Sequence, residues 1–170
     1  MRVKLGEGQE ATVFEVKNKH LVEKIFKEGY GPAIHRKPKS QYKLAKKIMK
    51  INKKKKLGLN LPRRIILKEH KRSKSSLLIS KLEGLKDENK LSSSEKEDFV
   101  SDKNRQVKIL EKHGYHSWVF WIDNFFPQKT TKGVRAVLAD FGTLSKKPLR
   151  IFSLLKRVME KITNLVWANK

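Results

Sequence analysis

The sequence contains no cysteine, which excludes disulfide bonds and zinc sites built from thiolates. It also lacks an apolar run near the roughly 18 residues that a membrane-spanning helix requires. A chain of 170 residues can bury one compact core, and a second domain of ordinary size would leave too little for the first. We therefore expect one domain over residues 1–170, in a cytoplasmic protein without a membrane span.

Acidic residues are also few in this sequence. Only 17 Asp and Glu oppose 41 Lys and Arg, which gives a formal net charge of +24, and no acid lies between Gly29 and Lys68. Such an excess attracts acidic or phosphate-rich partners. Most of the charge is carried by lysine, whose ammonium group suits general phosphate attraction better than bidentate base reading. An acidic protein partner is therefore favoured, and nucleic acid stays as the alternative, with residues 43–56 as its phosphate stripe.

Apolar and β-branched clusters in the first half predict five short antiparallel strands and one helix. The helix is expected at residues 41–53, with Ser40 as its N-cap and with Leu44, Ile48 and Ile51 at helical spacing. The strands are expected at residues 3–5, 12–16 and 21–26 and within "RRIILKEH" and "SLLISKLEG".

The second half is expected to be mainly helical. A helix is predicted from about residue 95 to residue 112, with Ser92 among its capping residues and with Phe99, Val107 and Leu110 as its apolar stripe. One further strand is expected in "VRAVLADFG". From Pro148 onward the pattern predicts a basic amphipathic helix, for which packing on the core is favoured over a membrane surface. Together these elements predict an α+β fold.

The stretch "GEGQEATVFEV" places Gly6 and Gly8 between two expected strands. Glycines at such a turn let the backbone approach a ligand phosphate, because no Cβ is in the way. Val13 can then cover an apolar base. An ordinary glycine-bearing hairpin explains the same residues when they are considered alone, so both interpretations stay open at this point.

Lys24 lies inside "LVEKIF", between apolar residues of an expected strand. A cation in such a setting is expected to have a partner, and a phosphate is one candidate. The alternative is that Lys24 simply alternates to solvent, as Lys27 is expected to do.

The segment "VLADFG" delivers one carboxylate, Asp140, from an apolar strand to a turn with a glycine. A carboxylate oxygen is the hard ligand that Mg²⁺ selects, and in proteins that ion often also bridges phosphate oxygens. Upstream, "WIDNFFP" offers Asn124 as a neutral oxygen ligand next to Asp123.

The order of glycine loop, strand lysine, asparagine and Asp-Phe-Gly resembles that of protein kinases. Ala11 takes the place of the loop's third glycine, and "LLISKLEG" resembles the strand and hinge over which adenine sits, with Lys81, Leu82 and Glu83 as the hinge. The resemblance implies that ATP and Mg²⁺ are cofactors, that Lys24 aligns the phosphates, and that Asp140 and Asn124 hold the metal. It also implies a protein kinase-like fold, with a five-stranded antiparallel N-lobe sheet and one helix over residues 1–84 and a strongly reduced helical C-lobe over residues 85–170.

Only 28 residues follow Gly142, which leaves no room for an activation segment and later helices. This minimal size is similar to that of the small effector kinases of the OspG and NleH type that enteric pathogens secrete. By that resemblance the protein would act inside a host cell after secretion.

Two departures from the kinase pattern bear on activity. The catalytic Asp, expected five residues before Asn124, is Val119, and Asp123 is the only acid nearby. The helix glutamate that pairs with the strand lysine has no acidic counterpart in residues 41–53, where Gln41 offers only a weak hydrogen bond. We therefore expect an ATP-binding pseudokinase or weak Ser/Thr kinase acting on a protein substrate, and the alternative is a basic binding module for an acidic protein or nucleic acid.

Overall fold

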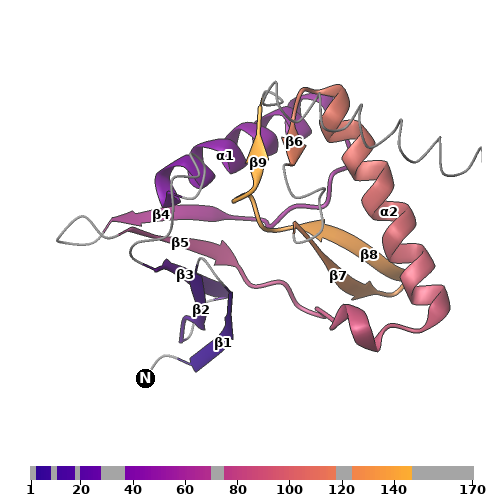
Figure 1. Ribbon diagram of the computed structural model, residues 1–170, viewed down its shortest axis with the longest axis horizontal. Coiled ribbons are helices and arrows are strands. Elements are labelled where there is room, and N and C mark those ends of the chain that lie inside the picture. The colour runs from indigo at the N-terminus through magenta and orange to yellow at the C-terminus, as the bar shows by residue number, and fades with distance from the viewer. Residues whose placement is uncertain are drawn as a thin grey trace, which may run out of the picture.

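The computed structural model describes residues 3–8, 11–17, 20–27, 37–69, 75–117 and 124–146 and shows an α+β fold. Its largest sheet has five strands in the order β1-β2-β3-β5-β4, and every neighbouring pair is antiparallel (Figure 1). The five predicted strands are therefore confirmed. Their bounds are β1 (Val3–Glu7), β2 (Ala11–Glu15), β3 (Leu21–Phe26), β4 (Ile65–Glu69) and β5 (Ser75–Ser80).

Helix α1 (Pro38–Lys55) lies across β4 and β5 and buries Leu44, Ala45 and Ile48 against them (Figure 1). The helix was predicted, but its predicted start at residue 41 with Ser40 as N-cap was wrong. Lys37 is the N-cap, it makes no side-chain cap bond, and Pro38 opens the helix. Proline suits the first helical turn because its φ is already helical and its missing N–H has no partner there anyway.

Helix α2 (Ser93–Lys112) begins slightly before its predicted start at about residue 95 and ends at the predicted residue. Ser92, one of the predicted capping residues, is its N-cap, and a short 3-10 turn, η1 (Glu88–Lys90), precedes it. The Ser92 hydroxyl accepts a hydrogen bond from the Glu95 amide at 3.3 Å, and the Glu95 carboxylate accepts one from the Ser92 amide at 3.1 Å. This reciprocal box satisfies two amides that the helix itself leaves unbonded. Phe99 and Leu110 of the predicted stripe are buried.

A two-stranded hairpin of β7 (Phe125–Thr130) and β8 (Gly133–Leu138) packs beside α2. The strand β8 was predicted, whereas β7 was not, because Pro127 and the aromatic run around it obscure the strand pattern. A second small ladder pairs β6 (His116–Ser117) with β9 (Leu144–Ser145). The helix predicted from Pro148 onward lies outside the described residues.

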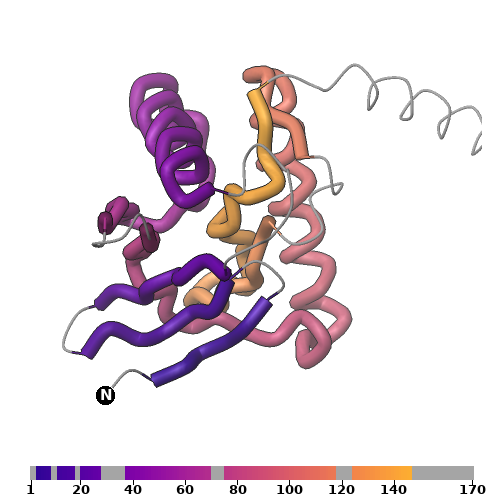
Figure 2. The backbone as a smooth tube through the Cα atoms, turned by 60° about the vertical axis from the view of Figure 1, so that its left-hand side comes forward, coloured from indigo at the N-terminus to yellow at the C-terminus, as the bar shows by residue number. Residues whose placement is uncertain are grey.

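One continuous hydrophobic core joins the two halves of the described chain. It runs from Ile48 of α1 and Leu77 of β5 to Phe99 of α2 and Phe141 beyond β8. Figure 2 shows α1 and α2 on opposite sides of the orange-to-yellow part of the chain, which contains β7, β8 and β9. In the part of the chain that the structure describes, no helix is long and apolar enough to cross a membrane.

Candidate functional site

The register of the large sheet brings three predicted site residues into one cross-strand row. Gly6 of β1 pairs with Val13 of β2, Val13 pairs with Lys24 of β3, and Lys24 pairs with Leu77 of β5. Paired residues of neighbouring strands share a face of the sheet. Ala11, which pairs with Phe26, lies on the same face because it is two residues from Val13.

Lys24 reaches across the chain from this row to Asp140. Its Nζ lies 2.9 Å from Asp140 Oδ2, although the two residues are 116 positions apart in the sequence. The Lys24 side chain is only 12% exposed, whereas the Asp140 side chain is 32% exposed. The expectation of a partner for Lys24 is confirmed, and the alternative of a solvated lysine is wrong.

The turn after β8 fixes the direction of the Asp140 carboxylate. Its second oxygen, Oδ1, accepts a hydrogen bond from the Gly142 amide at 2.8 Å. The Asp140 amide and the Ala139 amide both donate to the Asn124 carbonyl, at 3.3 and 3.1 Å. Next to it, Phe141 is 2% exposed and packs into the core. The carboxylate is therefore held on a short, anchored turn and still faces solvent in part.

Asn124 lies directly under this turn and is fully buried. Its Nδ2 donates to the Asp140 carbonyl at 2.7 Å and to Thr143 Oγ1 at 2.8 Å. Its Oδ1 accepts from the Ser117 hydroxyl, at 3.0 Å, and from the Thr143 hydroxyl, also at 3.0 Å. In this arrangement the Asn124 amide is satisfied inside the protein and holds the turn that carries Asp140. The predicted role of Asn124 as a metal ligand stays a prediction.

The two loop glycines stand where the fold itself leaves room for a side chain. A Cβ built on Gly6 would meet none of the described atoms within 4 Å, and one built on Gly8 would come only within 3.9 Å of the Ala11 carbonyl. Neither residue is among the described glycines with positive φ. Between them, Glu7 pairs with Lys27 at 2.6 Å and also with Lys4, and these two hydrogen-bonded cations lower the pKa of Glu7 to about 2.

The predicted hinge residues follow directly after β5. Lys81 is exposed, its amide donates to the His20 carbonyl at 2.9 Å, and its ammonium pairs with Glu15, which raises the pKa of Lys81. Leu82 is partly buried. The Glu83 carbonyl accepts a hydrogen bond from Gln128 Nε2 at 2.7 Å. The hinge is therefore tied on one side to the sheet and on the other side to β7.

Gln41 occupies the buried stripe of α1, one turn before Leu44 and Ala45. That stripe covers the face of the sheet on which Leu77 lies, and Leu77 is the cross-strand partner of Lys24. Gln41 is 1% exposed, and its Nε2 finds no hydrogen-bond partner in the part of the chain that the structure describes. Lys24 Nζ, itself a donor, could bond only to Gln41 Oε1. Among the described residues its hydrogen-bond acceptor is Asp140 instead, so the predicted weak bond from Gln41 to Lys24 does not form there.

Two of the sequence predictions cannot be placed, because Val119 and Asp123 lie outside the described residues. One buried carboxylate was not predicted from the sequence. Glu23 of β3 is 2% exposed and accepts a hydrogen bond from the Ser76 hydroxyl at 2.7 Å, with Lys68 Nζ at 3.5 Å. A glutamate inside an apolar strand was the available signal, since a buried acid needs partners.

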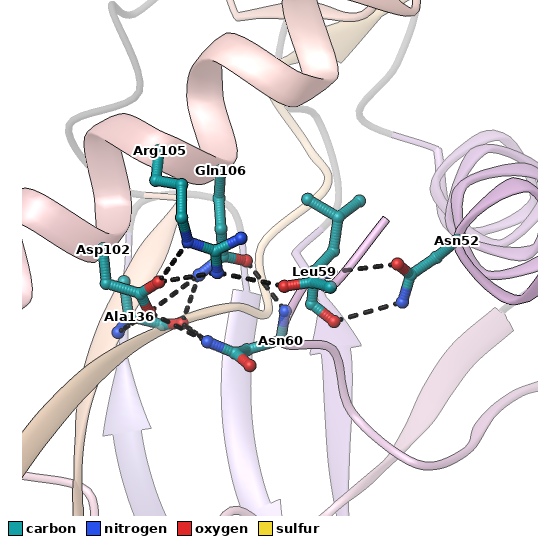
Figure 3. A network of polar contacts seen from close by, with 8 residues as sticks. Asn52, Leu59, Asn60, Asp102, Arg105, Gln106 and Ala136 are labelled. Atoms are coloured by element: carbon teal, nitrogen blue, oxygen red, sulfur yellow. Dashed lines mark hydrogen bonds and ion pairs between the residues drawn. The ribbon is translucent and has the colours of Figure 1, made fainter. Parts of the chain in front are cut away.

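A second polar cluster, missed by the sequence analysis, joins the loop after α1 to α2 and β8 (Figure 3). Asp102 Oδ2 accepts hydrogen bonds from Asn60 Nδ2 at 2.9 Å, from Gln106 Nε2 at 3.1 Å and from the Ala136 amide at 3.0 Å. Its Oδ1 accepts two from Arg105, at 3.0 and 2.7 Å. We call this set the Asp102 network. Gln106 was the available sign of this network in the sequence. It falls at helical spacing between Phe99 and Leu110, so a polar side chain lies in a buried stripe and needs hydrogen-bond partners.

No family model and no curated protein matches the chain. Among solved structures, the chain is similar to WbdD in its co-crystal structure with the kinase inhibitor LY294002, at a TM-score of 0.50 and 19% sequence identity. The match covers 94% of this chain but only 36% of that one, so the chain spans about a third of the neighbour's length. At this identity the likeness concerns the fold alone. The α+β fold of this chain, with its five-stranded antiparallel sheet and two helices, is kinase-like.

Proposed function

We propose that this protein binds ATP together with Mg²⁺ at the face of the sheet that carries Gly6, Val13 and Lys24. One observation carries the proposal: the contact of 2.9 Å between Lys24 Nζ and Asp140 Oδ2. A lysine and a carboxylate that meet at the edge of a partly open surface present a phosphate-binding cation and a metal-binding oxygen side by side.

The row of small and apolar residues supports the same proposal. Among the described residues, none fills the space beside Gly6 and only the Ala11 carbonyl comes near Gly8, so a ligand phosphate can approach the backbone there. Ala11 and Val13, on the same face, offer an apolar cover for a base, and Lys81, Leu82 and Glu83 are the proposed hinge beside it. A bound phosphate would explain why glycines occupy these two positions, which the hairpin alone does not explain.

The residues present fit a magnesium ion that arrives with the nucleotide. The described residues contain no cluster of three His, Asp or Glu side chains that would hold a metal by themselves. Mg²⁺ commonly takes one or two protein carboxylates and completes its octahedron with phosphate oxygens and water. Asp140 supplies one such carboxylate. Asn124, the second ligand expected from the sequence, would first have to give up the hydrogen bonds that Ser117 and Thr143 donate to its Oδ1, so water and phosphate oxygens are proposed for the remaining positions. ATP bound in this way would supply the phosphoryl group.

Transfer of that group is proposed to be slow or absent. General-base assistance is worth about 10²–10⁴-fold in rate, and Val119 stands where the base is expected. Gln41 cannot give Lys24 the charged partner that a glutamate would give. We further propose that the chain forms one minimal kinase-like domain over residues 1–170, with an N-lobe over residues 1–84 and a reduced C-lobe over residues 85–170. By the resemblance of its motifs to secreted effectors of the OspG and NleH type, a host protein is proposed as its substrate or partner.

Titration calorimetry with ATP and Mg²⁺ tests the proposal directly. We expect binding to the wild type, a loss of at least tenfold in affinity for Lys24→Ala and for Asp140→Asn, and no change for the exposed control Lys129→Ala. Because the described residues contain no cluster of three acidic or His side chains that would hold a metal, Mg²⁺ alone should give no heat. Equal affinity in the wild type and Asp140→Asn would overturn the proposed site.

Phosphoryl transfer needs a separate assay. Incubation with labelled ATP, Mg²⁺ and a generic protein substrate should give a rate far below that of an efficient kinase. Any transfer that belongs to this site must disappear in Asp140→Ala. Phosphoryl transfer that persists in Asp140→Ala would come from a contaminating kinase. If neither the wild type nor the variant transfers phosphate, the protein is a nucleotide-binding pseudokinase.

A further inference from the structure

A groove runs between the outer face of α1 and the loop that follows the helix. Its volume is about 690 Å³. Four of the residues that line it are apolar, three of them from the loop: Met49, Leu59, Leu61 and Pro62. Five cations stand around this floor: Lys46, Lys47, Lys50, Lys53 and Arg63. We call it the α1 groove.

The cations of the α1 groove are exposed, and none forms an ion pair with an acid of the described residues. Lys46, Lys50 and Lys53 follow one another at helical spacing, so their charges lie on one side of α1. Like charges at this spacing destabilise a helix. An acidic partner would relieve that repulsion, because residues 37–68 contain no acidic residue of their own.

The groove is pre-formed by hydrogen bonds. Asn52 of α1 holds both backbone groups of Leu59: its Oδ1 accepts from the Leu59 amide at 3.0 Å, and its Nδ2 donates to the Leu59 carbonyl at 3.1 Å (Figure 3). The next residue, Asn60, is fixed by the Asp102 network. A binding surface that is rigid before the partner arrives loses less conformational entropy on binding.

We propose that the α1 groove binds an acidic protein segment that inserts apolar side chains between its carboxylates. The charge of the rim selects acids, and the apolar floor selects leucine-like side chains, as in grooves that bind amphipathic helices. Met49, with its flexible thioether, suits a floor that adapts to such side chains. This surface is separate from Lys24 and Asp140, so it adds a partner to the proposed nucleotide site.

Nucleic acid fits the same surface less well. The groove lining contains no aromatic side chain, so it offers no platform on which bases could stack. It contains a single arginine, the residue type that most often reads bases through a bidentate fork. A sugar-phosphate backbone would also leave the apolar floor uncovered.

Fluorescence anisotropy with a labelled synthetic peptide tests the proposal. The probe is a helical peptide rich in Glu, with leucines at i and i+4, and it is titrated with the full chain without nucleotide. We expect Lys46→Glu/Lys50→Glu to weaken binding by roughly tenfold or more. The control Lys108→Glu/Lys112→Glu, with the same charge change at the same helical spacing on α2, should have a much smaller effect, because both of its lysines are exposed away from the groove.

Two further probes separate the partner classes. Replacing the peptide leucines by serine should weaken binding by roughly tenfold, since the apolar floor then buries nothing. A DNA duplex of equal charge should bind more weakly than the leucine peptide and should lose affinity steeply with salt. Three results would each overturn the proposal. The first is an equal loss of peptide affinity in the two double lysine variants, the second is unchanged affinity for the serine peptide, and the third is displacement of the leucine peptide by the duplex.

Discussion

Two polar contacts join the sheet half of the molecule to the α2 half, and they differ in how completely they are satisfied. In the Asp102 network both carboxylate oxygens are used, and five hydrogen bonds converge on one side chain that is 18% exposed. In the other contact, Lys24 and Asp140 share a single ion pair, and Asp140 is 32% exposed. The first contact is saturated, whereas the second retains capacity for another partner.

The difference indicates what each contact does. A saturated carboxylate with backbone and side-chain donors stabilises the relative position of the elements it joins, because any loss leaves donors without partners. A lone, partly exposed pair contributes little to stability, because water screens it. We therefore infer that the Asp102 network holds the fold together and that the Lys24–Asp140 pair is available for a ligand.

The largest expected effect is the loss of the Asp102 network. Asp102→Ala should lower the free energy of unfolding by about 3 kcal/mol, since the Ala136 amide, Asn60 and Gln106 all lose an acceptor. Urea denaturation measures this. Glu97→Ala, at an exposed position of the same helix, is the control. A change below about 0.5 kcal/mol in Asp102→Ala would remove the contrast between the two contacts.

A smaller effect of opposite sign is expected at Gln41. Gln41→Met keeps the length of the side chain but removes the donor that has no partner among the described residues. It should raise the free energy of unfolding by about 1 kcal/mol, because a buried polar group without a hydrogen bond is costly. Destabilisation by a similar amount would show that the Gln41 amide is bonded after all.

The Lys24–Asp140 pair itself should matter less for stability. Lys24→Ala is expected to cost about 1 kcal/mol or less in urea denaturation, since Asp140 keeps solvent and the Gly142 amide as partners. A loss of more than about 2 kcal/mol would mean that this contact is structural like the Asp102 network.

The smallest effect concerns acid stability at the start of α2. Lys86, at 2.7 Å, and the Ser92 amide together lower the pKa of Glu95 from its ordinary 4.5 to about 2. A lowered folded-state pKa stabilises the fold above pH 4.5, and that contribution is lost as the pH falls from 4.5 towards 2. Glu95→Gln should therefore be less stable than wild type at pH 7, with a difference that shrinks over this interval. A difference independent of pH would contradict the cause given for the shift.

The sequence predicted the elements better than the contacts between them. The five strands and both described helices follow from hydrophobic spacing, and the Ser92 cap follows from residue type. The predicted start of α1 was wrong because two N-terminal signals lie close together, Ser40 and Lys37-Pro38. The sequence alone does not show at which of them the helix begins. Strand β7 was missed because Pro127 interrupts its pattern.

The candidate site was only partly predictable. Lys24 and Asp140 stand out in the sequence because a charged residue sits next to apolar strand residues. Their contact at 2.9 Å depends on packing between segments 116 positions apart, which spacing cannot give. Asn124 was predicted as a metal ligand from its place in "WIDNFFP", upstream of Asp140. Its four hydrogen bonds to Ser117, Thr143 and Asp140 were not predictable, because they depend on the β6–β9 ladder, whose two-residue strands leave no pattern in the sequence.

The most direct measurement is the melting temperature with and without millimolar ATP and Mg²⁺, in wild type, Asp140→Asn and Asp102→Ala. A ligand at about 100 times its dissociation constant stabilises a protein by roughly 2.7 kcal/mol, which is several degrees for a domain of this size. We expect that shift in wild type, little or none in Asp140→Asn, and a preserved shift from a lower starting temperature in Asp102→Ala. An equal shift in wild type and Asp140→Asn, or none in wild type, would contradict the assignment of the Lys24–Asp140 pair as the nucleotide site.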